Sequence, residues 1–322
     1  MASHVASSAF TADPGWRLVR QPPLLSGRHT LRISRTSIKA LLLLAPILII
    51  LCFFIVVPAF QLIWISLTNL SPGRPAEFVG LDNYIYVLSD PAFIAALLRN
   101  VAFVLVVVTL EVGVGFAIAL VLQMKFPLRS LWFAIILAPF AVSPIVAVVM
   151  WKYMLDPTFG VVNYAISSVG LPRVPWMTDG PTSMAVIIIV AVWKEFAFTT
   201  IILFAALTSI PKELYEASRV DGATPWQNLV LVKIPLIAPA IAIVLLFRII
   251  FTLREFGVPW TLTGGGPGTA TEILSIYLYK QAFRYSDFGA GAAIGWIMLA
   301  VTVLLSSFLI RRTYRGMFPE DR

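Results

Sequence analysis

Two long apolar segments of this sequence carry charged side chains at helical spacing. In the first, Arg248, Phe251, Thr252 and Glu255 stand at positions i, i+3, i+4 and i+7, which share one face of a helix. Charged residues inside a membrane span are costly, and they usually face a cavity or a charged partner. Polar groups beside an aromatic ring supply hydrogen bonds and a stacking surface for a polar, ring-shaped solute. This segment is therefore a candidate binding face.

A second apolar segment repeats the pattern. Ala191, Glu195 and Phe198 stand at i, i+4 and i+7, with Lys194 and Thr199 beside them. The two segments together therefore predict a polar path between helices. The residues that we expect to contact a solute most directly are Glu195, Phe198, Arg248 and Thr252.

Ion pairing within a helical bundle is an alternative role for these charges. In this interpretation Arg248 pairs with Glu195 or Glu111, and Glu255 lies in the outer headgroup zone. Glu111 stands among valines, which favours a structural role as the partner of a basic residue. The charged residues counted within the spans are Lys152, Lys194, Arg248, Glu111 and Glu195. The excess of one positive charge leaves an anionic solute open.

The composition requires a membrane protein to position these side chains. Of the 322 residues, 59% are hydrophobic and only 12% are charged, and the mean hydropathy is +0.89. A spanning helix needs about 20 mostly apolar residues, and six runs qualify. They are residues 40–67, 101–122, 131–155, 183–207, 236–253 and 290–310. We therefore expect an all-α polytopic membrane protein, in which neighbouring helices satisfy the carbonyls freed by prolines such as Pro139 and Pro144.

The rare residue types exclude several classes of site. Cys52 is the only cysteine, and the two histidines, His4 and His29, both precede the first apolar run. No disulfide within the chain and no histidine or thiolate metal site are expected. No glycine is followed by lysine, so the phosphate loop of nucleotide-binding proteins is absent. The net charge of +8 reflects membrane orientation rather than binding to nucleic acid.

The distribution of basic residues predicts the orientation. With six spans, 15 of the 24 Lys and Arg residues fall on the side of the two termini, six on the other side and three within spans. Basic residues favour the cytoplasmic side, so both termini are expected there. Residues 1–39 are interpreted as a basic cytoplasmic tail and residues 40–322 as the membrane domain.

Between the fourth and fifth runs lies a polar segment, residues 209–235, which this orientation places in the cytoplasm. Ser209 is suited to cap a helix that starts near Pro211. Gly222 is suited to end that helix in the left-handed conformation. Thr224 with Gln227 forms a capping-box pattern for a second helix. The sequence therefore predicts two short helices that meet at a tight corner.

One face of the first short helix is built of small or mild residues, Leu214, Ala217 and Ser218, which favours close approach by another protein. Its sequence, Glu216-Ala217-Ser218, three residues, Gly222, nine residues and then Val-Lys-Ile-Pro to position 235, resembles the "EAA" loop of ABC importer permeases. That loop is written EAA, three, G, nine, I-x-L-P. The departures are conservative in size or polarity.

The resemblance implies a docking role for this segment. In that family the loop is a coupling helix, which sits in a cleft of a cytoplasmic ATPase subunit. The implied coupling residues are Leu214, Glu216, Ala217, Ser218, Asp221 and Gly222. ATP and Mg²⁺ are then expected in the partner ATPase, with no cofactor, catalytic residue or metal site in this chain.

Two further segments are similar to carbohydrate-uptake permeases of the maltose and glycerol-phosphate type. They are residues 78–100 and the glycine-rich stretch Thr261 to Leu274. The resemblance implies the type I importer architecture with six spans. It also implies contact of an external solute-binding protein with the outer glycine loop, at Gly264, Gly265, Gly266 and Pro267.

The implied function is a permease subunit of an ATP-driven importer in the inner membrane. Its expected partners are a second permease subunit of similar size, two ATPase subunits, a periplasmic or extracellular binding protein, a sugar and membrane lipid. The expected substrate path comprises Lys194, Glu195, Phe198, Thr199, Arg248, Phe251, Thr252 and Glu255. A neutral sugar and an anionic glycoside or polyol both remain open as substrates.

Two other classes of protein compete with this interpretation. A secondary transporter acting alone predicts inverted repeats and broken helices that build an ion site. No convincing repeat is found, and such a protein leaves residues 209–235 without a role. A membrane-embedded enzyme using a Glu and Lys pair lacks a nucleophile motif, a metal site or a cofactor loop.

Overall fold

The computed structural model describes residues 35–124 and 126–317. The chain divides into two compact units, Met1–Val56 and Val57–Arg322. The first contains α1 (Arg35–Leu51) and the π-helical turn η1 (Cys52–Val56). α1 begins inside the segment assigned to the basic tail, whose first 34 residues lie outside the described part.

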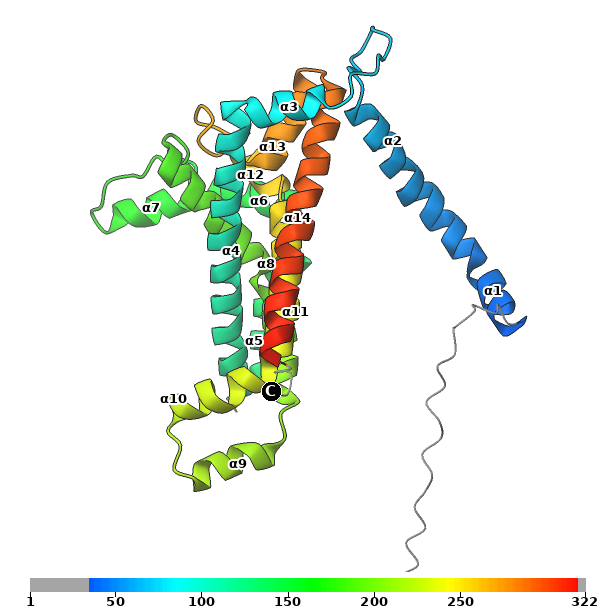
Figure 1. Cartoon of the computed structure of the whole chain (residues 1–322). Helices are drawn as coiled ribbons and strands as arrows, with labels where there is room; N and C mark the ends of the chain where they lie inside the picture. Colours follow the sequence, from blue (N-terminus) through cyan, green and yellow to red (C-terminus); the bar gives the residue numbers. More distant parts are fainter. Residues whose placement is uncertain (1–34, 125, 318–322) are drawn as a thin grey trace, which may run out of the picture. The chain divides into compact units, whose positions relative to one another are not determined.

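The second unit holds all the remaining elements, which are helices joined by loops (Figure 1). They are α2 (Val57–Ser66), α3 (Asp82–Ser89), α4 (Pro91–Gln123), α5 (Arg129–Ala141), α6 (Pro144–Met154), α7 (Val161–Ser168), α8 (Gly180–Thr208), α9 (Lys212–Val220), α10 (Pro225–Gln227), η2 (Asn228–Lys233), α11 (Ile234–Leu253), α12 (Gly257–Thr263), α13 (Leu274–Tyr279), η3 (Lys280–Arg284) and α14 (Phe288–Met317). Within the described residues, β structure is limited to one bridge between Thr68 and Phe78. The all-α prediction is confirmed.

Five helical segments of the described chain are long and apolar enough to cross a membrane, or six when α5 and α6 count as one broken span. The five are Leu43–Ser66, Pro91–Gln123, Gly180–Thr208, Pro225–Thr263 and Phe288–Phe308. Five of the six predicted runs fall on these segments, and the remaining run, residues 131–155, falls on α5 and α6. α4 starts ten residues before the predicted second span, because Asp90 caps it by accepting a hydrogen bond from the Ala92 N–H at 2.8 Å and Pro91 fits the first helical turn.

The third predicted span, residues 131–155, is not one helix. α5 and α6 meet at 97°, because Pro144 has no N–H to bond to the carbonyl of Phe140 one turn earlier. Val142, between them, adopts an extended conformation. The Lys194 Nζ of α8 donates to the freed Phe140 oxygen at 3.3 Å. A neighbouring helix therefore satisfies the carbonyl, but the chain bends sharply there.

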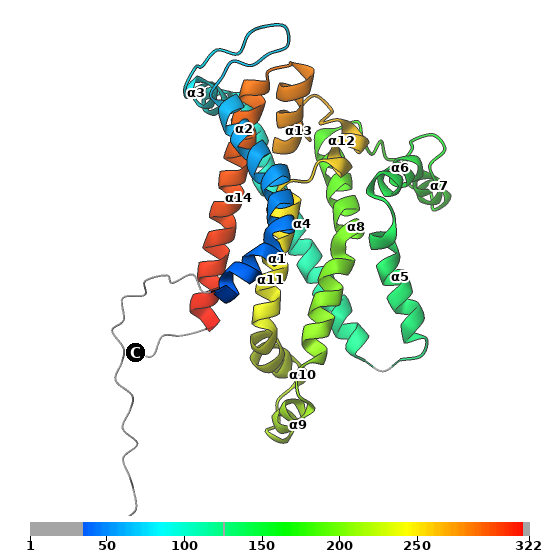
Figure 2. The ribbon, with the colours of Figure 1, turned by 90° about the vertical axis from the view of Figure 1, so that its right-hand side faces the viewer.

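Four long helices of the second unit, α4, α8, α11 and α14, run side by side in Figures 1 and 2. α4 and α8 approach closely at Gly115, where an added Cβ would stand 2.6 Å from Thr199 Cγ2. Small residues at such crossings let backbones come together in a membrane. Apolar side chains, including Phe103 and Ile187 at one end and Leu203 and Ile237 at the other, fill the interior.

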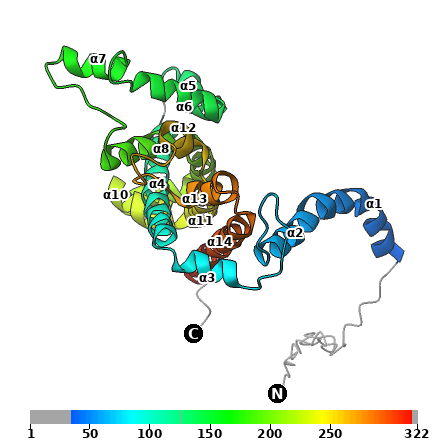
Figure 3. The ribbon, with the colours of Figure 1, turned by 90° about the horizontal axis from the view of Figure 1, so that it is seen from above.

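The two ends of this bundle carry different structures. α9 and α10 lie together at one end, and α12, α13 and the glycine-rich loop lie at the opposite end (Figure 1). Seen from above, α5, α6 and α7 extend to one side, away from α14 (Figure 3). The predicted path residues lie on α8 and α11, between the two ends, except Glu255, which follows α11.

Candidate functional site

A cluster of four charged side chains joins three helices inside the bundle. Arg248 of α11 donates from Nε and Nη2 to Glu111 of α4, at 2.6 and 2.7 Å. Its Nη1 donates to Glu195 of α8 at 3.1 Å. Paired, charge-assisted hydrogen bonds of this kind are short and directional. The sequence suggested that Arg248 pairs with Glu195 or Glu111, and in the structure it pairs with both.

Lys194 connects this cluster to α5. Its Nζ lies 3.7 Å from Glu195 Oε1, donates to the Phe140 carbonyl at 3.3 Å and stands 5.4 Å from the centre of the Phe140 ring. The lysine therefore stabilises the broken end of α5 and neutralises part of the charge on Glu195. It is a structural contact as well as a candidate path residue.

The four charges differ in their access to solvent. The exposed fraction of the Glu195 side chain is 29%, against 7% for Lys194, 5% for Arg248 and 0% for Glu111. The part of the cluster that a solute can reach is therefore mainly a carboxylate. Its net charge, counted over these four groups, is zero.

A row of aromatic rings lies beside the cluster and crosses three helices. The ring centres of Phe140 and Phe198 are 6.4 Å apart, those of Phe198 and Phe247 are 6.3 Å apart, and those of Phe247 and Phe251 are 6.2 Å apart. Phe140, Phe247 and Phe251 are exposed. Neither Phe140 nor Phe247 was among the path residues predicted from the sequence. Spacing of four residues between Phe247 and Phe251 was the signal that could have identified one of them.

Three predicted path residues are placed differently from the expectation. Thr199 is buried against Gly115 of α4, so it serves helix packing. Phe251 is exposed whereas Arg248 and Thr252 are buried, because a residue three positions on is rotated by about 60° around the helix. Glu255 follows the end of α11 and accepts a hydrogen bond from the Val258 N–H at 3.0 Å, so it caps α12.

The segment 209–235 contains the two predicted short helices. α9 ends at Gly222 with φ +75°, and the N–H groups of Gly222 and Ala223 bond back to Arg219 and Ser218 at 3.0 Å each. This is the Schellman arrangement. Thr224 and Gln227 form the expected capping box at the start of α10. The tight corner is confirmed.

α9 starts next to Pro211, as predicted, but the cap predicted for it is wrong. Ser209 ends α8 instead, and its Oγ donates to the Ala206 carbonyl at 2.8 Å. Pro211 occupies the cap position of α9 without any side-chain hydrogen bond. Serine bonds readily to the carbonyls of the preceding turn, and here that local bond prevails over capping the next helix.

Ser218 also differs from the expected exposed face. It is buried, and Asn228 Nδ2 donates to its Oγ at 2.5 Å. The bond joins α9 to η2. Tyr215 packs at the ends of α4 and α8, where the Lys233 Nζ lies 5.3 Å from its ring centre. The segment is therefore fixed to the bundle by residues on its inner side.

The outer side of the segment is open. Five of the six predicted coupling residues are exposed: Leu214, Glu216, Ala217, Asp221 and Gly222. Three large apolar side chains of the segment that were not predicted as coupling residues are more exposed than Leu214, namely Val220 at 88%, Trp226 at 71% and Leu231 at 70%. Large apolar residues within a polar connection were the signal for them. Exposed apolar groups of this kind mark an interaction surface.

The glycine-rich loop at the opposite end is partly internal. Gly265 is buried, with φ +96°, and an added Cβ would stand 3.2 Å from Ile276. It therefore shapes the loop and offers no surface to a partner, which corrects the contact predicted for it. Gly264, Gly266 and Pro267 are partly buried, whereas Gly268 and Thr269 are exposed.

The same loop is tied down by charged and hydroxyl groups. Thr271 Oγ1 donates to the Gly266 carbonyl at 2.7 Å, and Lys280 pairs with Glu272. Arg99 Nη1 donates to the Glu272 carbonyl at 2.7 Å. These contacts hold the exposed tip in one position.

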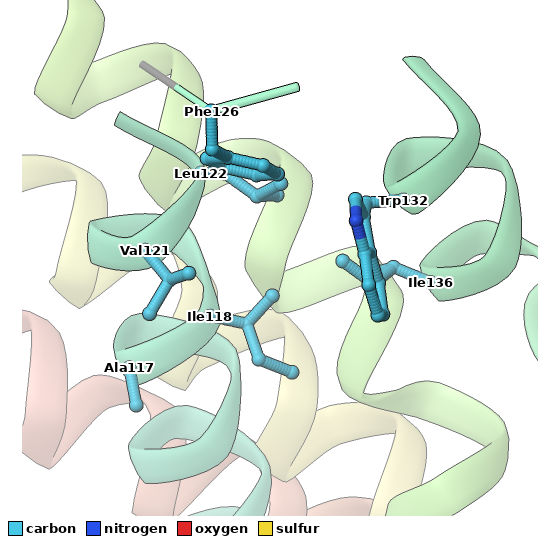
Figure 4. A pocket seen from close by; sticks show the side chains of 7 residues that line it. All are labelled: Ala117, Ile118, Val121, Leu122, Phe126, Trp132 and Ile136. Atoms are coloured by element: carbon cyan, nitrogen blue, oxygen red, sulfur yellow. The ribbon is translucent and has the colours of Figure 1, made fainter. Parts of the chain in front are cut away.

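An apolar pocket of about 560 Å³ lies between α4 and α5 (Figure 4). Its lining residues are Ala117, Ile118, Val121, Leu122, Phe126, Trp132 and Ile136. Trp132 and Ile136 come from α5 and the residues up to Leu122 from α4. The pocket offers apolar side chains and no charged group, so the charge cluster remains the candidate site for a polar solute.

Comparison with known proteins agrees with this arrangement. Residues 111–318 match the family described as "Binding-protein-dependent transport system inner membrane component". The chain is 35% identical over 283 residues to the trehalose/maltose transport system permease protein MalF of Thermococcus litoralis, which covers 87% of this chain and 94% of the relative. It is 32% identical over 274 residues to the sulfoquinovosyl glycerol transport system permease protein SmoG of Agrobacterium fabrum, covering 84% and 89%.

A solved structure has the same fold. The crystal structure of a bacterial ABC transporter that imports the acidic polysaccharide alginate matches with a TM-score of 0.77 and 25% sequence identity, over 87% of this chain and 98% of that chain. The architecture of the type I importer permeases, predicted from the sequence, is thereby confirmed.

Proposed function

Because the chain belongs to the family of inner-membrane components of binding-protein-dependent transport systems, we propose that it forms half of the path by which an ATP-driven importer carries a sugar or sugar derivative. The relatives named for trehalose or maltose and for sulfoquinovosyl glycerol support a glycoside as the substrate. The exposed aromatic row and Glu195 supply the groups that such a solute needs, because a pyranose stacks its C–H face on a ring and donates its hydroxyls to acceptors.

A second permease subunit of similar size completes the path in this proposal, and two ATPase subunits hold ATP and Mg²⁺. Both termini and the segment 209–235 face the cytoplasm, and the glycine-rich loop faces a solute-binding protein outside. ATP binding closes the ATPase pair, α9 moves with its cleft, and α8 and α11 turn as levers that open the path outward. Hydrolysis reverses the motion.

The observation that carries the proposal is the shape of the segment 209–235. Its inner side is bonded to α8 through Tyr215 and closed on itself by the bond between Asn228 and Ser218, and its outer side exposes Val220 and Trp226. A connection between two spans that needed no partner would not expose these apolar groups at a rigid corner. A cytoplasmic ATPase is the partner that the family supplies.

Loss of ATPase binding tests this docking role. Val220→Asp and Trp226→Ala should each lower the ATPase that co-purifies with the permease by about tenfold or more, since central interface residues contribute about 2 kcal/mol or more each. Matched controls are Val169→Asp and Tyr164→Ala, both 72% exposed at α7, which should leave the co-purification unchanged. Equal loss in all four variants, or in none, would reject the assignment.

The outer contact is tested at the exposed tip of the glycine loop. Thr269→Trp adds bulk at an exposed position, so it should reduce stimulation of the ATPase by the binding protein while leaving basal ATPase activity intact. A substitution at Gly265 is unsuitable for this purpose, because it would distort the loop itself.

A further inference from the structure

The basic side chains near the path already form ion pairs with carboxylates of the same chain. All three bonded nitrogens of Arg248 donate to Glu111 or Glu195, and Lys194 is shared between Glu195 and the Phe140 carbonyl. The third basic residue counted in the spans, Lys152, lies exposed in the last turn of α6 and forms no ion pair within the part of the chain that the structure describes. The positive excess seen in the sequence is therefore outside the cluster.

An anionic solute would have to take one of these cations from its partner. Glu111 is fully buried and depends on Arg248 for two of its hydrogen bonds. Moving the guanidinium towards a solute would leave a buried carboxylate without compensation, which is strongly unfavourable in a membrane interior. The cluster therefore resists an incoming anion.

The most accessible group of the cluster is a hydrogen-bond acceptor. Glu195 Oε2 is bonded to Arg248, whereas Oε1 lies 3.7 Å from Lys194, beyond hydrogen-bond distance. Within the described chain Oε1 receives no hydrogen bond. It is available to a donor such as a sugar hydroxyl, and its negative charge repels a carboxylate, phosphate or sulfonate.

We propose that this half of the path selects uncharged, polyhydroxylated solutes and disfavours anions, with Glu195 as the residue that determines this choice. The exposed rings of Phe140, Phe247 and Phe251 form an uncharged wall beside it. The inference rests on the proposed function, because it assumes that a glycoside passes this face. It decides between the two substrate classes that the sequence left open.

Direct binding to the assembled importer tests the proposal. The complex, reconstituted in nanodiscs without its binding protein, is titrated by saturation-transfer NMR with two probes of one ring type, methyl α-D-glucopyranoside and methyl α-D-glucuronide. The neutral probe should bind at least about tenfold more tightly, because like charges placed together cost more than the 1.4 kcal/mol of a tenfold change. Glu195→Gln should reduce the ratio to about threefold or less, and Glu195→Asp should preserve it.

A matched control and the opposite outcomes complete the test. Glu77→Gln removes the same charge from an exposed loop that follows α2, so the ratio should not change. Tighter binding of the glucuronide, or an unchanged ratio in Glu195→Gln, would overturn the inference while leaving a sugar path in place. Loss of the glucuronide signal in Lys152→Met would then identify Lys152 as the selecting group. Absence of binding by both probes would instead reject the proposed function.

Discussion

The charge cluster and the coupling segment 209–235 use their polar groups for different purposes. The cluster brings Glu111, Glu195 and Arg248 from three helices and pairs them inside the bundle. The coupling segment satisfies its backbone locally, through a Schellman turn and a capping box. Its large apolar side chains point outward. Polar groups therefore hold the helices of the bundle together, whereas in the segment 209–235 they leave large apolar groups exposed.

Removing one member of the charge cluster should lower the stability of the helical bundle. Arg248→Met leaves the fully buried Glu111 without its cation, which we expect to destabilise the permease by about 3–5 kcal/mol. Thermal unfolding in detergent, followed by fluorescence-detected gel filtration, measures the loss. Arg219→Met removes an exposed arginine from α9 and should leave the unfolding temperature unchanged.

A double substitution separates lost pairing from lost packing. Glu111→Leu with Arg248→Met removes both charges, so it should recover most of the stability, because replacing a whole buried pair by apolar residues is often neutral. If the double variant is no more stable than Arg248→Met, packing of the arginine stem is the cause and the electrostatic explanation is wrong.

A smaller loss of stability is expected when a larger side chain is added where α4 meets α8. Gly115→Val places a Cβ 2.6 Å from Thr199 Cγ2, so we expect a cost of about 1–3 kcal/mol. Gly113→Val, two residues earlier on the same helix, has no atom within 4 Å of its added Cβ. Valine has a higher helix propensity than glycine, so this variant should lose no stability. Equal unfolding temperatures for the two variants would show that this crossing is not tightly packed.

Local signals were sufficient for much of the fold. Apolar runs located every membrane helix, and Gly222, Thr224 and Gln227 fixed the corner of the coupling segment, because capping depends on residues a few positions apart. The bend at Pro144 was not predicted. A proline in a span can either kink or break the helix, and here the outcome depends on Lys194, which is 50 residues away in the sequence and bonds to the Phe140 carbonyl.

The candidate site was harder to predict, because its residues lie on different sides of their helices. Spacing placed Arg248 and Glu195 in reach of each other, and the ion pair confirms it. Spacing did not reveal that Thr199 faces Gly115 or that Phe247 joins the aromatic row. Those facts depend on how far each helix is rotated about its axis in the bundle, which a single sequence does not specify.

The prediction with the smallest expected effect concerns the capping box of the coupling segment. In the capping box, Thr224 Oγ1 accepts from the Gln227 N–H at 3.3 Å, while Gln227 Oε1 accepts from the Thr224 N–H at 2.8 Å. Thr224→Ala removes only the first bond, so α10 should lose about 1 kcal/mol. Hydrogen exchange of the Gln227 amide should then be about fivefold faster, with the global unfolding temperature unchanged.

Thr224→Ser keeps the hydroxyl and should exchange as the wild type does. If the corner transmits force as one rigid body, the same looseness should lower ATP-driven uptake in Thr224→Ala without lowering the amount of bound ATPase, because Val220 and Trp226 remain exposed. Faster exchange with undiminished uptake would mean that α9 couples to the bundle through Tyr215 and through the bond between Ser218 and Asn228, without α10. The rigid element would then be α9 with η2, and the α10 turn would contribute only surface.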